Sequence, residues 1–88
     1  MEDYALKYRL AGNLNTTITG KYLYTLLCDL AGKKGRIQLS IRVLSETLNI
    51  SRTAVSRNLH RLEESGYIRI RSVSDSDGTR KANEYIIC

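Results

Sequence analysis

Five polar side chains between residues 52 and 60 have types that suit contact with a nucleic acid. They are Arg52, Thr53, Ser56, Arg57 and His60. An arginine guanidinium is a planar fork that can donate two hydrogen bonds to a guanine edge or to a phosphate, and Thr and Ser can contact either a base or a phosphate. A face that only meets water would be served by almost any polar mixture. The residue types therefore favour nucleic-acid contact over a solvated face.

The apolar residues of the same stretch indicate a helix. They are Val55, Leu59 and Leu62, spaced i, i+4, i+7. With Val55 at zero and about 100° per residue, Thr53, Arg57 and His60 fall at about 140° to 200°, on the opposite side. Ser56 and Arg52 fall on the flank, at about 100° and 60°. All five thus lie on the part of the helix that a core leaves free.

Charge is concentrated in the middle of the chain. The 88 residues carry a formal net charge of +5, and 42% of them are hydrophobic, which fits one small domain. Residues 36–71 hold seven basic groups, all of them arginine, against three acidic groups. A basic patch of this kind favours a polyanionic partner.

The sequence lacks the residue sets of an enzyme. We find no acid pair, no nucleophile beside a base and no glycine-rich phosphate loop, and the one histidine belongs to the polar helix face. Cys28 and Cys88 lie far apart and predict neither a zinc site nor a disulfide framework. We therefore expect no catalytic activity, no cofactor, no metal and no small-molecule ligand. The acidic start and the lack of an apolar run of about 20 residues predict a cytoplasmic protein without a membrane partner.

Two further helices and a tight turn are expected to position the polar face. The first helix follows the Thr residues at 16–17 and ends at Gly32 and Gly35, and its apolar stripe is Leu23, Leu26, Leu27 and Leu30. A short extended piece, residues 36–40, leads to Ser40 as the cap of a two-turn helix that buries Leu44 and Leu48.

The sequence "LNIS" predicts a sharp turn between this helix and the next. Asn49 tolerates the left-handed conformation, Ile50 can enter the core, and Ser51 can cap a helix that runs to about Ser65. Gly66 stands where a helix ends in a left-handed residue.

A hairpin is expected at the C-terminal end. "YIRIRSV" alternates Ile68 and Ile70 inward with arginines outward, Asp77-Gly78 signals a tight reversal, and "EYIIC" returns as a second strand in which Tyr85 packs within the hairpin. At the other end, the alternation in residues 4–11 favours a strand, although the same residues also pair at helical spacing. We thus divide the chain into an N-terminal arm, 1–16, and a domain, 17–88.

The sequence "LSETLNISRTAVSRNLHRLEESGYIRI" resembles a known signature. It is similar to the bacterial winged-helix regulators of the MarR and GntR families, and to the helix-turn-helix domains of plasmid and phage replication proteins, over about residues 18–87. The resemblance implies an α+β, mainly α, winged helix-turn-helix fold with three helices and a C-terminal β-hairpin wing, to which the N-terminal strand would be added. Asn49 stands where glycine is common in these families.

Docking of such a domain implies a larger set of contact residues. The recognition helix, about 51–65, would enter the major groove of duplex DNA and the wing, 67–87, would follow the flanking backbone. Arg57 is the best candidate for a guanine contact. The expected DNA-binding residues are Ser40, Arg42, Ser51, Arg52, Thr53, Ser56, Arg57, His60, Arg80 and Lys81.

The leading hypothesis is a transcriptional regulator that binds double-stranded DNA sequence-specifically. We expect a homodimer, because one winged helix reads only a few base pairs, and the candidate surfaces are residues 1–16 and the helix side with Tyr22 and Leu26. Two alternatives stay open: a DNA-binding module of a replication initiator or primosome protein, and a winged helix that binds protein.

Overall fold

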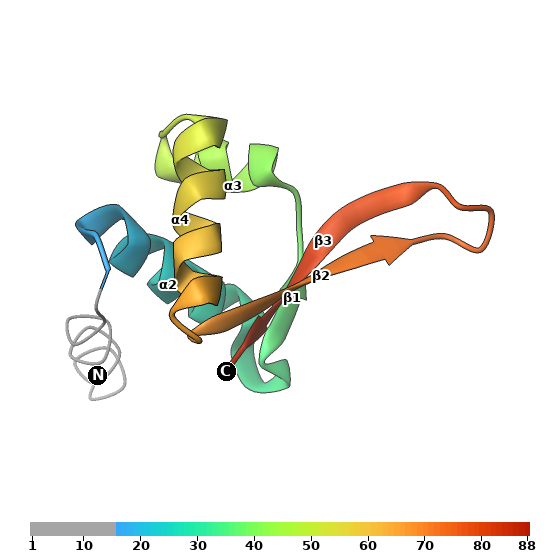
Figure 1. Cartoon of the computed structure of the whole chain (residues 1–88), viewed down its shortest axis with the longest axis horizontal. Coiled ribbons are helices and arrows are strands. Elements are labelled where there is room, and N and C mark those ends of the chain that lie inside the picture. Colours follow the sequence, from blue (N-terminus) through green and yellow to red (C-terminus); the bar gives the residue numbers. More distant parts are fainter. Residues whose placement is uncertain (1–15) are drawn as a thin grey trace.

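A computed structural model of the chain describes residues 16–88, and the expected N-terminal strand lies outside these residues. Three helices and a small sheet follow one another, with the sheet strands drawn out into a long hairpin (Figure 1). The elements are α2 (Ile18–Ala31), η1 (Gly32–Lys34), β1 (Arg36–Gln38), α3 (Ile41–Leu48), α4 (Arg52–Glu64), β2 (Ile68–Ser74) and β3 (Arg80–Ile87). The predicted three helices and C-terminal hairpin are confirmed.

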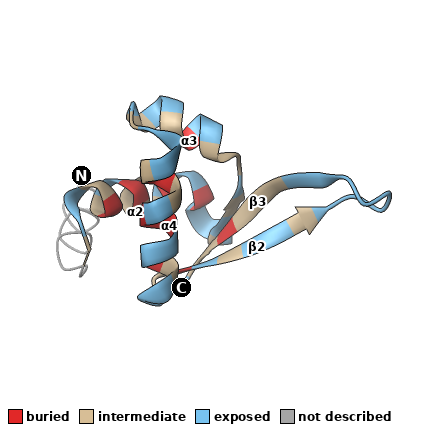
Figure 2. Cartoon of the chain, turned by 45° about the horizontal axis from the view of Figure 1, so that its top comes forward, coloured by how far each residue is buried: buried red, intermediate tan, exposed pale blue. Residues whose placement is uncertain are grey.

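The core lies where α2, α3 and α4 meet the base of the sheet (Figure 2). Its fully buried side chains are Leu23, Leu27, Leu44, Val55, Leu59, Leu62, Ile68 and Tyr85. The wing beyond this base is mostly exposed (Figure 2). The three buried positions expected in α4, at Val55, Leu59 and Leu62, are confirmed.

The buried stripe of α2 differs from the expected one. Leu30 is 47% exposed and Leu26 is half-buried, whereas Gly20 and Ala31 are buried. Residues 20, 23, 27 and 31 follow the helical repeat with steps of three or four, so the inward side of α2 is rotated away from Leu30. The expectation for Leu30 was wrong because the large side chains outline a broader stripe than the one that the neighbouring helices cover.

The turn between α3 and α4 forms as the sequence indicates. Asn49 adopts the left-handed conformation, φ 56°, and its N–H donates to the carbonyl of Ser45. Ile50 is half-buried against the core. Ser51 caps α4 by accepting a hydrogen bond from the N–H of Ala54 at 3.1 Å.

The sheet has three antiparallel strands in the order β1-β3-β2. The short extended piece after η1 pairs with β3, Ile37 opposite Tyr85, and Ile70 lies opposite Tyr85 from the other side. Directly opposed residues share a face, so these three side chains form the inner face toward the helices. Tyr85 is only 1% exposed, so it belongs to the core of the domain rather than to the hairpin alone.

An irregularity in β3 changes which face its residues present. Arg71 pairs with Glu84, but Val73 pairs with Lys81, so two steps along β2 match three along β3. Such a β-bulge reverses the alternation beyond it. Arg80, opposite Ser74, therefore lies on the inner side, and Lys81, opposite Val73, lies on the outer side.

Candidate nucleic-acid interface

The polar side of α4 is open to solvent in its N-terminal half. Arg52, Thr53 and Arg57 are exposed and Ser56 is half-buried. These four residues line one shallow depression together with Ile41, the first residue of α3. The structure thus brings together four of the five residues that the sequence pattern placed on one helix side.

The starts of α3 and α4 hold the hydroxyl caps. Ser40 accepts a hydrogen bond from the N–H of Val43 at 3.2 Å, as Ser51 does from Ala54. A helix N-terminus carries unpaired N–H groups and a partial positive charge, which favour a phosphate. Arg42 is exposed in the first turn of α3, next to Ser40.

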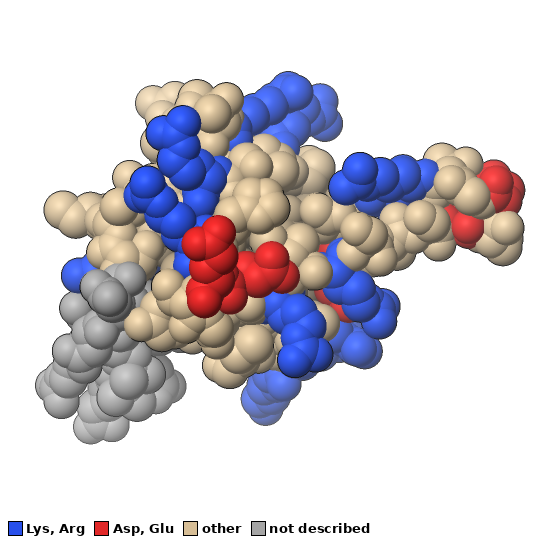
Figure 3. Space-filling model, in the orientation of Figure 1, with Lys and Arg blue, Asp and Glu red and all other residues tan. Residues whose placement is uncertain are grey.

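Cations of this region are available to an external anion. Within residues 16–88, Arg42, Arg52 and Arg57 take part in no ion pair. Basic groups gather over the N-terminal half of α4 and over α3, while acidic groups cover the C-terminal half of α4 (Figure 3). The positive charge of α4 is therefore concentrated toward its N-terminal half.

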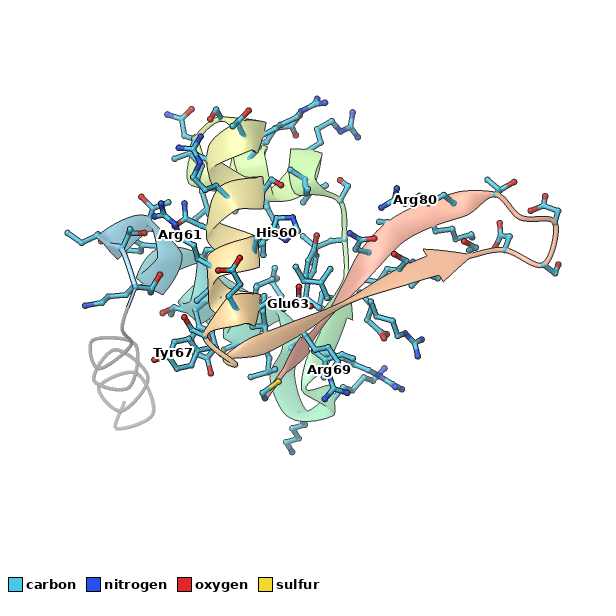
Figure 4. The ribbon with its side chains drawn as sticks, in the orientation of Figure 1. His60, Arg61, Glu63, Tyr67, Arg69 and Arg80 are labelled. Carbon is cyan, nitrogen blue, oxygen red and sulfur yellow. The ribbon has the colours of Figure 1, made fainter. Side chains whose placement is uncertain are left out.

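His60 and Arg61 mark the two flanks of α4 farther along the helix. His60 is exposed and points toward the wing side, whereas Arg61 points toward α2 (Figure 4). Arg61 lines a hollow with Thr16 and Thr17 at the start of α2. His60 is not part of the depression beside Ile41, so only its place on the exposed side of α4 connects it with the other four residues.

The two wing residues expected to bind DNA lie on opposite faces. Arg80 projects from the edge of the wing nearer α3 (Figure 4) and makes no ion pair within the described residues. Lys81 is on the outer side, with its Nζ 3.3 Å from a carboxylate oxygen of Asp75. Arg80 therefore lies on the side of the sheet that faces the helices, and Lys81 on the opposite side.

The wing tip carries a persistent negative charge. Hydrogen bonds from Thr79, above all from its backbone N–H at 2.9 Å, lower the pKa of the Asp77 carboxyl. Asp77 therefore stays ionised at neutral pH, and it repels phosphates at the far end of the hairpin.

Two polar residues of α4 that the sequence pattern did not single out hold the interface in place. Asn58 is 6% exposed; its Oδ1 accepts from the Thr17 hydroxyl at 2.7 Å, and its Nδ2 donates to the Ala54 carbonyl. A Glu63 carboxylate oxygen accepts from the N–H of Ile70 at 2.8 Å, which joins α4 to β2. In the sequence, Asn58 could have been identified as a polar residue beside the apolar stripe of the helix. No local feature of the sequence distinguishes Glu63 from Glu64.

The arrangement is that of a winged helix-turn-helix domain: a tight turn, an exposed second helix and a hairpin wing beside it. A sequence model of the MarR family matches residues 29–78, which is more than half of the chain, and the chain belongs to this family. Proteins of the MarR family are transcription regulators that bind DNA, typically as dimers, so the chain carries a DNA-binding regulator domain.

Searches among curated proteins and among solved structures give no significant match to the chain. Among residues 16–88, no helix combines the length and the apolar character needed to cross a bilayer.

Proposed function

We propose that the chain reads a specific sequence in double-stranded DNA, with α4 in the major groove and Arg80 on the flanking backbone. The observation that carries this proposal is the depression that Arg52, Thr53, Ser56 and Arg57 line beside Ile41. Recognition of a base edge requires hydrogen-bond donors and acceptors on an exposed helix, and the N-terminal half of α4 offers both. The family match supports the regulator function and gives no support to a replication module or a protein-binding module.

Within this proposal, the residues divide by what they touch. Arg57 donates two parallel hydrogen bonds to a guanine, and Thr53 and Ser56 contact bases or phosphates. Phosphate contacts come from Arg42, from the helix starts at Ser40 and Ser51, and from Arg52 and His60 on the rims of the exposed side.

We further propose that the functional unit is a homodimer, because two half-sites give a genomic target enough length. The candidate surface on α2 includes Tyr22, 62% exposed, and Ile18, 73% exposed one turn earlier. Leu26 contributes less than expected, since it is half-buried against the core. Residues 1–15, the rest of the expected dimer surface, lie outside the described part of the chain.

Selection from a random duplex library tests the proposal, because it reports duplex binding, sequence preference and half-site symmetry together. We expect an enriched motif of two inverted half-sites about one helical turn apart. Recovery of a random pool at every salt concentration would overturn sequence-specific reading.

Two substitutions then separate reading from positioning. Arg57→Ala should relax the preference at one base position, at a cost of about 1–3 kcal/mol for the preferred base. Arg42→Ala should weaken all sequences alike and reduce the salt dependence by about one phosphate contact. Affinities for the selected site and for single-base variants of it, measured across a salt series, make the comparison. Equal losses on every sequence from both variants would contradict the assignment of Arg57.

A further inference from the structure

A second group of basic side chains lies on the outer face of the sheet. Because opposed residues share a face, Arg36, Ile86 and Arg69 form one row across β1, β3 and β2. The next row on the same face contains Gln38, Glu84 and Arg71. Three arginines from two edge strands thus flank the central strand.

The turn before β1 adds two lysines to this face. Lys33 and Lys34 are exposed in η1 and line one hollow with Arg36, Gln38 and Glu84. Glu84, the acid of these rows, is held by Arg71, with 3.2 Å between Nε and Oε1. The Arg71 side chain is 63% exposed and that of Glu84 only 16%, so the guanidinium still meets solvent while the carboxylate is largely covered. We call Lys33, Lys34, Arg36, Arg69 and Arg71 the outer sheet surface.

This surface faces away from the helix that reads DNA. The inner face of the same sheet packs Tyr85 and Ile70 against the core that α4 also contacts. Arg69 projects below the sheet in Figure 4, while Arg80 lies above it. Basic groups gather both above and below the molecule in Figure 3, with the acidic end of α4 between them. One straight duplex cannot touch both areas.

The composition of the outer sheet surface indicates the kind of partner. The core of a protein interface is apolar and poor in charge. On the two rows, however, the apolar residue is Ile86, which is half-buried, and of the apolar residues that line the adjoining hollow, Leu30, Ala31 and Ile37, only Leu30 is exposed. The cations are spread over a lattice, about 10 Å across the sheet and about 7 Å along a strand, so they suit a row of separate anions rather than one small ligand. Arginine also pairs with phosphate through two parallel hydrogen bonds.

We propose that the outer sheet surface holds a second stretch of duplex DNA through its phosphates, so that one domain links two duplex segments. This contact is independent of base sequence and sensitive to salt, since it rests on backbone charge. It goes beyond the proposed reading of a specific site, and it stands on different residues.

Capture of a second duplex tests the proposal on the full chain. Beads carry one duplex, a fluorescent duplex of unrelated sequence is added with the protein at low ionic strength, and bead fluorescence reports linking. Arg36→Ser/Arg69→Ser should retain the affinity for a single selected site within about twofold but reduce capture about tenfold, through the loss of two phosphate contacts. Arg61→Ser, which removes an exposed cation on the α2 side of α4, outside both the outer sheet surface and the proposed reading residues, is the matched control for Arg69→Ser and should leave capture near the wild-type level.

Three outcomes are informative. Loss of capture in the Arg36/Arg69 variant alone, with circular dichroism unchanged, supports the proposal. Undiminished capture in that variant overturns it, because linking would then come from two α4 helices in a dimer; undiminished capture together with binding of an acidic protein would assign the surface to that partner. Arg52→Ser/Arg57→Ser tests the proposed function separately: if sequence preference survives in that variant, the α4 assignment fails while the outer-surface result still stands.

Discussion

Single side chains distinguish the proposed reading face from an ordinary solvated helix face. The arginines at the start of α4 make no ion pair within residues 16–88, whereas the acid near its end, Glu63, is engaged by the backbone of β2. The arginines thus lie at the N-terminal end of α4, and the acids, Glu63 and the exposed Glu64, lie at its C-terminal end. The division also explains why acidic residues at the C-terminal end of α4 are compatible with DNA binding at its N-terminal end.

The two neighbouring cations of the wing should differ in their effect on DNA affinity. Arg80→Ala should lower affinity about three- to tenfold and reduce the salt slope by about 0.9, the value for one phosphate contact. Lys81→Ala should change affinity less than about twofold, because its ammonium group already pairs with Asp75 and lies on the outer side of the wing. Fluorescence anisotropy on a single site, repeated across salt concentrations, measures both. Equal losses from the two variants would show that the bulge does not decide which cation meets the duplex.

At the scale of elements, the local signals in the sequence account for the helices and the turn. The apolar period predicts α4, and the caps Ser40 and Ser51 and the left-handed Asn49 set its junction with α3, because each acts through neighbours within four residues. β1 has three residues, too few to show an alternating pattern, and its pairing with β3 depends on contacts about 50 residues apart. The bulge in β3 cannot be predicted from the sequence either, because it depends on the pairing register of β2 and β3.

The same limit applies to the candidate site. The exposed side of α4 follows from helix geometry alone, so its five polar residues could be named from the sequence. The separation of Arg80 from Lys81 and the bonds of Glu63 and Asn58 depend on tertiary packing, so sequence spacing could not reveal them.

The junction between α2 and α4 should depend on Asn58. Asn58→Ala removes the acceptor of the Thr17 hydroxyl and a buried amide, and should lower the free energy of unfolding by about 1–2 kcal/mol. Ser65→Ala, at the exposed end of α4, is the control and should stay within about 0.5 kcal/mol of the parent. Urea unfolding followed by circular dichroism gives both values. An unchanged midpoint for Asn58→Ala would mean that packing alone holds the two helices together.

At the scale of the whole molecule, stability should fall in alkali. Burial, followed by the neighbouring Cys28 thiol, raises the pKa of Tyr24 from 10.0 to about 12, and burial also raises the pKa of Tyr85. The folded state thus favours the neutral phenols, so this stability is fully present below about pH 10 and is lost as the pH rises toward about 12. Denaturant unfolding at a series of pH values measures the loss.

A tyrosine variant makes this prediction specific. Tyr24→Phe should reduce the alkaline loss of stability, whereas Tyr22→Phe, at a position 62% exposed, should leave it as steep as in the parent. The same alkaline slope in all three proteins would assign the loss to other groups.

The bulge in β3 decides which face of the hairpin Arg80 and Lys81 occupy. Strict alternation from Tyr85 along a regular strand of the present length would put Lys81 on the inner side and Arg80 on the outer side, so the one extra residue at position 82 or 83 exchanges the two cations while the composition of the wing stays the same. For this hairpin, the uptake of one extra residue as a bulge therefore exchanges the positions of two cations as a double substitution would, and the number of residues in the segment has to be compared, as well as their identity, when related wings are aligned.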